Sequence, residues 1–433
     1  MTTEIGFIGL GLLLVLLALR VPVALSLIAV SMGGISVMFG WETSISLLAD
    51  SPYDFVSAWT LSAVPMFLLM GFVCYHSGLT TGLFNAAKVV FRWLPGGIAI
   101  SSIFASSAFA SVCGSSVACA AAMGRIAIPE MVKGGYKPSF ACGTIAAGGT
   151  IGALIPPSIL MIVYGVFAQV SITQIFLGGI SIGIMTAVSY SIIVLLMSWW
   201  RPQDVPRVAH DADEHSLGQV LYDIWPVGLL GLLVFGGLFS GFFTATEAGA
   251  VGALGSLVIA GILRRLDWAN VKTAFLDTLA TTSSLLIIGI GASMFTVFLS
   301  LSGVAGIIAE SVGGWELTYL QLMLVVVLIY LFLGLFMEPF GAMLVTLPIF
   351  FPIFESYDIN LIWFGVLLVK LLEIGMITPP VGMNIFVIRG VAGQYASLVD
   401  IFRGVSIFLI ADLAVVAILI FYPQVVLFMA GGE

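Results

Sequence analysis

The sequence predicts an all-α protein that crosses a membrane many times. Of its 433 residues, 61% are hydrophobic and only 8% are charged, whereas roughly a quarter of the residues of a soluble domain are charged. Apolar runs of about 20 residues, the length that crosses a hydrocarbon core of about 30 Å, recur along nearly the whole chain. Because every backbone N–H and C=O in hydrocarbon needs an internal partner, we expect these runs to be helices. The alternating segments of about 10 residues that are typical of membrane barrels do not occur.

The apolar and amphipathic segments follow the same order in two halves of the chain. The first half has predicted spans at 5–19, 21–40 and 58–78, an amphipathic stretch at 79–93, a small-residue segment at 97–128, and long segments at 138–168 and 175–200. The second half has spans at 226–242, 246–263 and 276–300, an amphipathic stretch at 302–315, and segments at 317–353, 360–390 and 402–428. We therefore expect a first repeat over 1–200, a hydrophilic linker loop over 201–223 and a second repeat over 224–433.

A single offset relates the two halves. A shift of 223 residues places Pro129 on Pro352, Gly152 on Gly375, Pro156 on Pro379 and Pro157 on Pro380. Prolines and glycines are common in membrane helices, but their shared register and order favour a true repeat. Paired interrupted helices in two halves of a permease indicate a binding site near the membrane midplane.

Basic residues predict that the two repeats have opposite topology. If 97–128 and 317–353 are re-entrant hairpins, each half has five spans, about ten in all, and the hairpins enter from opposite sides. With both termini in the periplasm, all Lys and Arg residues except Lys370 lie on the cytoplasmic side: Arg20, Lys88, Arg92, Arg125, Lys133, Lys137, Arg201, Arg207, Arg264, Arg265, Lys272, Arg389 and Arg403. This distribution is the one that the positive-inside rule requires.

The hairpin tips are the predicted substrate-binding positions. The first hairpin carries Gly114, Ser115 and Ser116 at its tip, and hydroxyls beside a free helix N-terminus can hold an anion. A Ser-rich helix-packing surface is the alternative. The second hairpin carries Glu338, followed by Pro339. Because a carboxylate in the membrane is costly, Glu338 is expected to cap a helix, to form an interhelical hydrogen bond or to contact a ligand.

The two Pro-Pro pairs predict broken helices in 138–168 and 360–390. Each proline lacks an N–H and frees a carbonyl one turn back, so the local helix can unwind. Carbonyls such as those of Gly152, Ile155, Gly375 and Thr378 then become candidate Na⁺ ligands. A kink that serves only packing is the alternative. Thr378 also has a hydroxyl, whereas Ile155 at the equivalent position has none, so two cation sites would differ.

Charged residues in the predicted spans of the second half are expected to interact with nearby residues. Lys370 and Glu373 lie one helical turn apart, and we expect a structural ion pair rather than a substrate counter-ion. Asp412 in the last span is interpreted as a buried hydrogen-bond partner. Glu247 is expected to cap the helix that begins near Thr244 or Thr246.

Several classes of function have no support in the sequence. The four cysteines lie in apolar segments without metal-ligand spacing, and His76, His210 and His215 are too scattered for a metal site. No nucleophile elbow, P-loop or HExxH motif occurs. We therefore expect a protein that is not an enzyme, binds no transition metal, cofactor or nucleic acid, and uses at most Na⁺ as a coupling ion.

Four motifs together carry a resemblance to a known family. GSSVACAAAMGRIAIPEM, GTIGALIPPSILMIVYG, GFFTATEAGAVGA and EIGMITPPVGMNIFVIRG resemble the large permease subunit, of the DctM type, of tripartite ATP-independent periplasmic (TRAP) transporters, over residues 5–428. The resemblance implies an inverted-repeat elevator in the bacterial inner membrane that imports a small carboxylate with Na⁺. It also implies a periplasmic solute-binding protein and a separate small four-helix membrane subunit as partners.

The resemblance also implies site residues. One Na⁺ site would use Ser111, Gly152, Ile155 and Pro157, and the other would use Gly334, Gly375, Thr378 and Val381. The 223-residue offset pairs Ser111 with Gly334, which agrees with this assignment. Substrate would lie between the tips, near Ser115, Ser116 and Glu338. A Na⁺/dicarboxylate symporter that needs no binding protein is the nearest alternative, and a channel is a more distant one.

Overall fold

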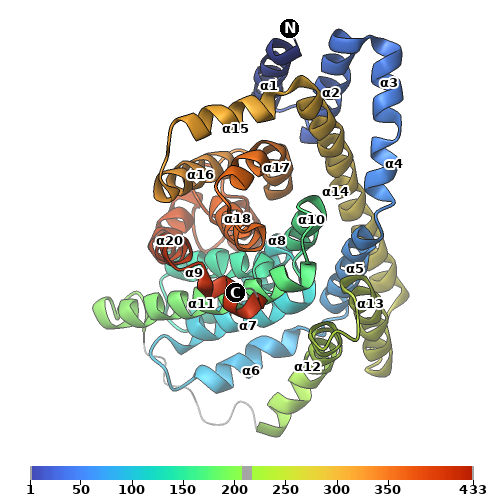
Figure 1. Cartoon of the computed structure of the whole chain (residues 1–433). Helices are drawn as coiled ribbons and strands as arrows, with labels where there is room; N and C mark the ends of the chain where they lie inside the picture. The colour runs from blue at the N-terminus through green and yellow to red at the C-terminus, as the bar shows by residue number, and fades with distance from the viewer. Residues whose placement is uncertain (1, 207–216, 432–433) are drawn as a thin grey trace.

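The computed structural model describes residues 2–206 and 217–431, and within these ranges the chain is helical without a strand (Figure 1). The helices of the first half are α1 (Thr2–Ala18), α2 (Val23–Phe39), α3 (Trp41–Ala49), α4 (Ser51–Val56), η1 (Trp59–Ser62), α5 (Ala63–His76), α6 (Thr81–Phe91), α7 (Gly97–Cys113), α8 (Ser116–Lys133), α9 (Pro138–Thr150), η2 (Ile151–Ala153), α10 (Ile159–Phe167) and α11 (Ile172–Trp200). Those of the second half are α12 (Leu217–Phe239), α13 (Ala245–Ile262), α14 (Trp268–Ser302), α15 (Val304–Gly314), α16 (Tyr319–Gly334), α17 (Pro339–Ser356), α18 (Leu361–Gly375), α19 (Met383–Ala392), α20 (Leu398–Phe421) and α21 (Gln424–Ala430).

The prediction of an all-α polytopic membrane protein is confirmed. In the described ranges, seven segments are long and apolar enough to cross a membrane, among them α11, α14 and α20. The helices α1 and α2 are apolar but have 17 residues each. Their length is at the lower limit for a span, since about 17 to 25 residues are needed.

Helix boundaries coincide in the two halves at the predicted offset. Shifted by 223 residues, α6 covers the same positions as α15, the end of α8 at Lys133 falls on the end of α17 at Ser356, and the start of α9 at Pro138 falls on the start of α18 at Leu361. The division of the chain into repeats at 1–200 and 224–433 stays a prediction. The opposite topology of the two halves stays a prediction.

The structure differs from the sequence prediction at four places, one of which is the last predicted span, 402–428, which is divided into α20 and α21. Residues 41–56 form α3 and α4, which the hydropathy pattern did not reveal because these short helices are amphipathic. The expected linker loop ends early, since α12 begins at Leu217; residues 207–216, with His210 and His215, lie outside the described ranges. Finally, α14 has 35 residues and begins at Trp268 rather than near 276. The predicted span was shorter than the helix, because a charged residue ends an apolar run but does not end a helix.

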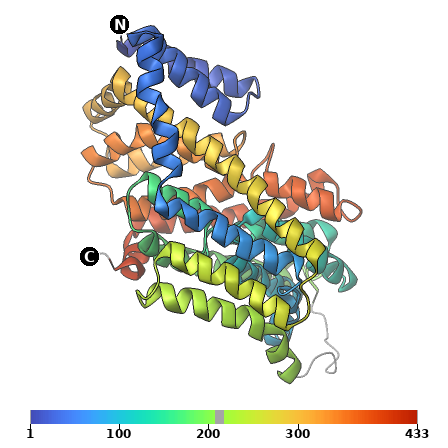
Figure 2. The ribbon, with the colours of Figure 1, turned by 90° about the vertical axis from the view of Figure 1, so that its right-hand side faces the viewer.

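The helices α13 and α14 pack against helices of the first half. Figure 2 shows α14 running obliquely across the molecule, in contact with α2 and α5. The neighbouring α13 packs on α5, where Gly249 lies against Ala63 and Phe67. The predicted cap of α13 is confirmed, because the side chains of Thr244 and Glu247 form a capping box.

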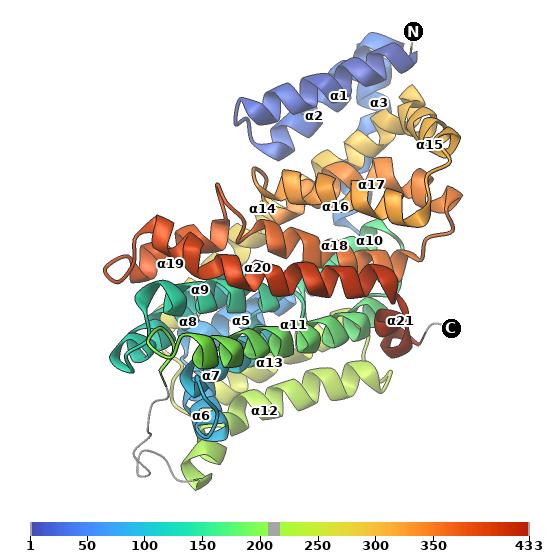
Figure 3. The ribbon, with the colours of Figure 1, turned by 90° about the vertical axis from the view of Figure 1, so that its left-hand side faces the viewer.

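The helices that carry the predicted site form one block, in which α9, α11, α18 and α20 lie together (Figure 3). Small residues allow close contacts there: Gly143 of α9 and Gly404 of α20 touch backbone to backbone. Such contacts are typical of helix pairs in membranes, where close packing replaces the hydrophobic drive for association. The block holds both broken helices at fixed positions beside the two hairpins.

Candidate functional site

The first hairpin consists of α7 and α8, joined at Gly114 and Ser115. Gly114 ends α7 with a positive φ of 59°, which glycine adopts without strain. A side chain at Gly114 would also collide with the carbonyl oxygen of Pro157, so the tip touches the first Pro-Pro pair. Ser115 is the N-cap of α8, and its hydroxyl accepts a hydrogen bond from the N–H of Ala118 (3.4 Å). The tip therefore presents the N-terminus of an 18-residue helix.

The second hairpin consists of α16 and α17, and its break spans residues 335–338. Glu338 occupies the N-cap position of α17, but its side chain makes no capping hydrogen bond. Of the three roles expected for Glu338, capping is therefore excluded in this structure. The carboxylate is half-buried and lines a cavity. This position leaves its oxygens available to a ligand.

The first broken helix consists of α9, the short η2 and α10. Its Pro156–Pro157 peptide bond is cis, and Ser158 caps α10 by accepting from the N–H of Met161. A side chain on Gly152 would lie 3.0 Å from the Cα of Ser116. The absence of a Cβ at Gly152 therefore lets the break approach the hairpin tip. The Ile155 side chain packs on Gly183 of α11, so this residue can offer a ligand only its backbone carbonyl.

The second broken helix consists of α18 and α19, and its Pro379–Pro380 bond is also cis. Gly375 at the end of α18 meets Gly334 at the end of α16, where an added Cβ would lie 2.7 Å from the facing Cα. The Thr378 hydroxyl donates to the carbonyl of Ile374 (2.6 Å). Pro379, Pro380 and Val381 are exposed, and Val381 keeps 40% of its surface accessible.

Both hairpin tips and both breaks border one cavity of about 420 Å³. The first hairpin contributes residues 114–118 and the second contributes residues 338–340. The first break contributes Ala153 and Ile159, and the second contributes Glu373, Met376 and Met383. The opposite wall comes from α5 and α14. A cavity of this size is in the range that encloses a small organic molecule.

The cavity wall is acidic. Its ionisable side chains are the carboxyl groups of Glu338 and Glu373, and among the described residues no Lys, Arg or His lines it. Glu373 is 1% exposed, and its Oε2 atom has no hydrogen-bond partner in the described part of the chain. The hydroxyl of Ser116, also in the wall, is likewise buried without a hydrogen-bond partner there. Buried polar atoms in folded proteins are nearly always hydrogen-bonded, and the Ser116 hydroxyl lies close enough to the Glu373 carboxyl for the two groups to serve as partners of each other.

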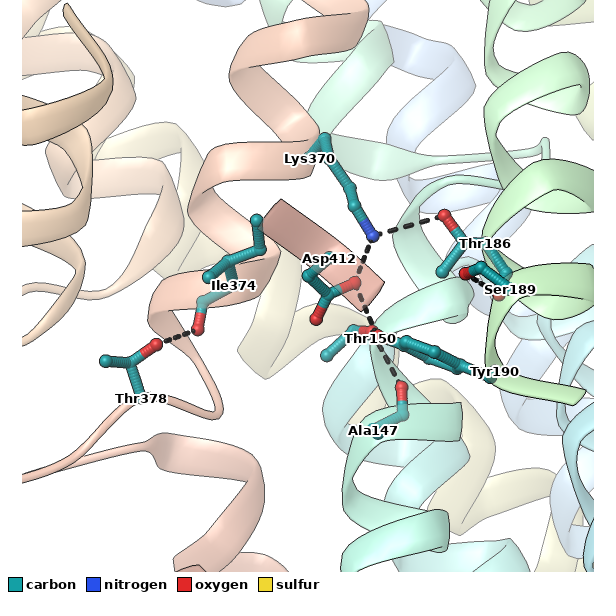
Figure 4. Close-up of polar contacts among 9 residues, drawn as sticks. All are labelled: Ala147, Thr150, Thr186, Ser189, Tyr190, Lys370, Ile374, Thr378 and Asp412. Carbon is teal, nitrogen blue, oxygen red and sulfur yellow. Dashed lines mark hydrogen bonds and ion pairs between the residues drawn. The ribbon is translucent and has the colours of Figure 1, made fainter. Parts of the chain in front are cut away.

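A buried ion pair lies behind this wall (Figure 4). Lys370 of α18 donates from Nζ to Asp412 of α20 (2.5 Å) and to the hydroxyl of Thr186 of α11 (3.1 Å). The hydroxyl of Tyr190 donates to the same Asp412 oxygen (2.7 Å), and Thr150 of α9 bonds to Tyr190 (3.2 Å). All five residues are almost fully inaccessible. The network therefore ties α9, α11, α18 and α20 together.

This network corrects one prediction and confirms another. The expected ion pair of Lys370 with Glu373 is wrong, because Lys370 bonds to Asp412 from a different helix. The interpretation of Asp412 as a buried hydrogen-bond partner is confirmed. Helical spacing identifies only neighbours on the same helix, whereas the partner of Lys370 in the structure is Asp412, 42 positions away in the sequence.

The structure brings the predicted site residues together in groups. Ser115, Ser116 and Glu338, predicted for substrate, line the same cavity. Of the residues predicted for Na⁺, Gly334 meets Gly375 across the second hairpin and break, and Gly152 approaches Ser116 at the tip of the first hairpin. Ser111 lies one turn before the tip of α7, and its hydroxyl donates to the carbonyl of Ala108 (2.7 Å). Thr378 faces a different, apolar cavity of about 810 Å³ that also borders Pro379.

Two polar residues near the second break were missed or misassigned. Glu373 was predicted to form an ion pair with Lys370, whereas the structure places Glu373 in the cavity wall. Asn384, just after the second Pro-Pro pair, is fully buried, and neither of its side-chain polar atoms has a hydrogen-bond partner in the described ranges. Asn384 could have been found from its place in the PPVGMN motif, two residues after Gly382, the N-cap residue of α19.

Sequence comparisons identify the relatives of this chain. The family model of the DctM component of tripartite ATP-independent periplasmic transporters matches residues 10–425. A C4-dicarboxylate TRAP transporter large permease protein of Vibrio cholerae is 35% identical over 84% of this chain and 85% of its own length. An ectoine/5-hydroxyectoine TRAP transporter large permease protein of Ruegeria pomeroyi is 30% identical over 96% of both chains.

Two solved structures share the fold. The YdaH transporter of Alcanivorax borkumensis superposes with a TM-score of 0.66 at 15% identity, over 89% of each chain. MtrF of Neisseria gonorrhoeae, which belongs to a class of antimetabolite efflux pumps, superposes with a TM-score of 0.62 at 16% identity, over 89% of this chain and 86% of its own. At this identity the likeness concerns the fold alone. The motifs and the match over nearly the whole length show that the chain belongs to the DctM family, the large membrane permeases of TRAP transporters, and is a transporter rather than an enzyme.

Proposed function

We propose that this permease imports a small organic acid into the bacterial cytoplasm together with Na⁺, by an elevator motion of its hairpins and broken helices. The observation that carries the proposal is the single cavity on which both tips and both breaks converge. A carrier must present one site alternately to the two sides of the membrane. Paired broken elements around one midplane cavity are typical of transporters that do so.

Two Na⁺ sites are proposed, one in each half. The first would use Ser111 and the carbonyls near Gly152, Ile155 and Pro157. The second would use Gly334, Gly375, Thr378 and Val381. Carbonyl and hydroxyl oxygens are hard donors that suit a hard cation, and unwound backbone supplies them in broken helices. The backbone contact between Gly334 and Gly375 supports the pairing of hairpin and break in the second site.

The carboxylate of the solute is proposed to bind at the first hairpin. There the N-terminus of α8 carries partial positive charge, and backbone N–H groups at a helix start attract anions. Ser115 and Ser116 add hydroxyls at this end of the cavity. Glu338 would contact the solute from the opposite tip.

The elevator would move the block of hairpins and broken helices against α5 and α14, which form the far wall of the cavity. In this proposal the halves are inverted repeats and both termini are periplasmic, as the distribution of basic residues predicts. The partners would be a periplasmic solute-binding protein and a small four-helix membrane subunit. Relatives named for C4-dicarboxylates and for ectoine support a carboxylate-bearing solute.

Coupling to Na⁺ is energetically sufficient for accumulation. Each net positive charge that moves inward gains about 2.3 kcal/mol per 100 mV, which corresponds to roughly fifty-fold accumulation. Two Na⁺ ions with one monocarboxylate would carry one net charge, to which the Na⁺ gradient adds.

The test is uptake into proteoliposomes that contain the permease with its small subunit and receive solute-loaded binding protein. We expect uptake only when an inward Na⁺ gradient and the binding protein are both present. Equal uptake without the Na⁺ gradient would disprove the coupling. Equal uptake of free solute without the binding protein would favour the symporter that needs no partner.

A further inference from the structure

The Ser116 hydroxyl differs from most other hydroxyls of the first hairpin. Several serines of α7 donate to a carbonyl three or four residues earlier: Ser101, Ser102, Ser107 and Ser111. Ser116 is the first residue of α8, so no helical carbonyl of α8 precedes it. Its hydroxyl does not cap the helix either, because Ser115 accepts the capping hydrogen bond. Since Ser116 is only 4% exposed, its hydroxyl is expected to have a partner on another element.

Glu373 of α18 supplies that partner. Its carboxyl group lies within reach of the Ser116 hydroxyl, and neither Ser116 Oγ nor Glu373 Oε2 has another hydrogen-bond partner in the described residues. The ammonium of Lys370, one turn before Glu373, is held by Asp412 and Thr186. A carboxyl oxygen accepts a hydrogen bond from a hydroxyl whether or not the carboxyl group carries a proton. The contact therefore joins α8 of the first half to α18 of the second half at the cavity wall.

The backbone of Ser116 also lies against the first broken helix. A Cβ on Gly152 would lie 3.0 Å from the Cα of Ser116, and a Cβ on Gly149 would lie 3.2 Å from its carbonyl oxygen. Glu373 belongs to the last turn of α18, which ends at Gly375, where the second break begins. The start of α8 is thus in contact with the first break through its backbone and with the edge of the second break through one side chain.

We propose that Glu373 is a positioning residue, which holds the start of α8 at the cavity by accepting a hydrogen bond from the Ser116 hydroxyl. The inference rests on the proposed function, because the solute carboxylate is proposed to bind at this end of the first hairpin. The hydroxyl proton points to Glu373, and the backbone N–H groups of the first turn of α8 stay available to the carboxylate. A shift of the second break is then transmitted to the first hairpin, so the two halves do not shape the cavity independently.

Hydrogen exchange in the purified full-length permease, without solute or Na⁺, tests the contact. The readout is the amide exchange rate over residues 119–123, which begin with the first N–H bonded within α8, that of Cys119. Ser116→Ala removes the donor, and Glu373→Met removes the acceptor at similar volume. We expect each change to raise the exchange rate about tenfold, the factor expected for one buried hydrogen bond.

Two further variants separate this contact from general packing. The double variant should exchange no faster than either single one, because both changes remove the same bond. Glu373→Gln keeps an acceptor oxygen and should restore slow exchange. Ser107→Ala is the matched control, since the buried Ser107 hydroxyl donates within α7 to the carbonyl of Ile103, and it should leave residues 119–123 unchanged. Glu373→Leu takes the place of Glu373→Met if the latter does not assemble.

Three results would overturn the inference. They are parent-like exchange at the start of α8 when the Glu373 carboxyl is removed, effects of the two single variants that add in the double variant, and fast exchange that persists in Glu373→Gln. Because exchange is measured without solute or Na⁺, such a result leaves the proposed import standing. Absence of Na⁺-driven uptake by the parent protein would refute the proposed import and leave the contact in place.

Discussion

The two broken helices have the same construction but different surroundings. In the first, Pro156 and Pro157 are buried beneath the hairpin tip, where Gly114 touches the Pro157 carbonyl. In the second, Pro379 and Pro380 are exposed, and the residues around them border the apolar cavity of about 810 Å³. The first break is thus closed by its own hairpin, whereas the second is open on one side. Equivalent sequence positions therefore do not have equivalent access in this conformation.

The difference extends to the polar residues. At the 223-residue offset, Lys370 corresponds to Ala147, Glu373 to Thr150, and Asp412 to Ser189. The second half thus carries three buried ionisable side chains where the first half carries an alanine and two hydroxyl residues. Figure 4 shows Lys370 and Asp412 of the second half together with Ala147, Thr150 and Ser189 of the first half. The first half supplies close packing and hydroxyls, and the second half supplies the charges.

The largest expected effect comes from breaking the buried ion pair. Asp412→Ala leaves the Lys370 ammonium buried, with the Thr186 hydroxyl as its one remaining hydrogen-bond partner among the described residues and the Tyr190 ring nearby. Removing one partner of a buried pair costs about 3–5 kcal/mol. We expect the unfolding temperature of the purified complex to fall strongly or the protein to fail to assemble. The equivalent change in the first half, Ser189→Ala, removes only a hydrogen bond to the Thr186 carbonyl and should cost about 1 kcal/mol or less.

A double replacement sharpens this prediction. Lys370→Met with Asp412→Leu removes both charges, and apolar replacement of a whole buried pair is often neutral. We expect this variant to recover most of the stability that Asp412→Ala loses. If the double variant were as unstable as the single one, the ion pair would not be the source of the loss.

The next effect concerns the contact between hairpin and break in the second half. In Gly375→Ala the new Cβ would lie 2.7 Å from the Cα of Gly334, and a backbone atom cannot yield as a flexible side chain can. Overpacking of this kind typically costs about 1–3 kcal/mol, and it should also lower the transport rate by displacing the break. Gly390→Ala on α19 is the control, because a Cβ there meets nothing within 4 Å.

A smaller effect is expected for the hydroxyl that joins the halves. Tyr190→Phe removes the donor to Asp412 and the contact with Thr150, while the ring still packs on Phe408. Loss of a hydrogen bond to a charged group should cost about 1.5–3 kcal/mol, and the remaining Lys370 contact should keep the loss near the lower value. Thermal unfolding measures it, and a loss as large as that of Asp412→Ala would show that Tyr190 rather than Lys370 holds the carboxylate.

Most of the fold could be predicted from the sequence, because apolar runs and prolines determine the structure of the segment in which they occur. Span order, both hairpins and both breaks follow from apolar runs, glycines and Pro-Pro pairs. The amphipathic helices α3 and α4 were not predicted, because they contain too few apolar residues for a span. Helix ends that extend beyond the apolar runs, as in α14, were not predicted either. Hydropathy shows which residues lie in the membrane, whereas a helix can continue outside it.

The candidate site was predictable only where its residues belong to the repeat. Ser115 and Glu338 were found from their positions at the hairpin tips, and the cavity includes both. The partner of Lys370 was not found, because a sequence displays spacing along one helix and not the approach of another. A charge argument would have helped: Lys370 and Asp412 are isolated charges in apolar spans, and each needs neutralisation in the membrane.

The smallest expected effect on stability belongs to Thr378, the position at which the two predicted cation sites differ most. Its hydroxyl donates to the carbonyl of Ile374, but the oxygen keeps lone pairs that can accept a cation, and Ile155 in the first half has no such atom. Thr378→Ala should cost about 0.5–1.5 kcal/mol, leave membrane insertion intact and raise the Na⁺ concentration needed for half-maximal uptake. Ile155→Val changes the equivalent residue without touching an oxygen and should leave the Na⁺ dependence unchanged. If both variants keep the parent Na⁺ dependence, the coupling ion in the second half is held by backbone carbonyls alone, and the two sites are more alike than their side chains.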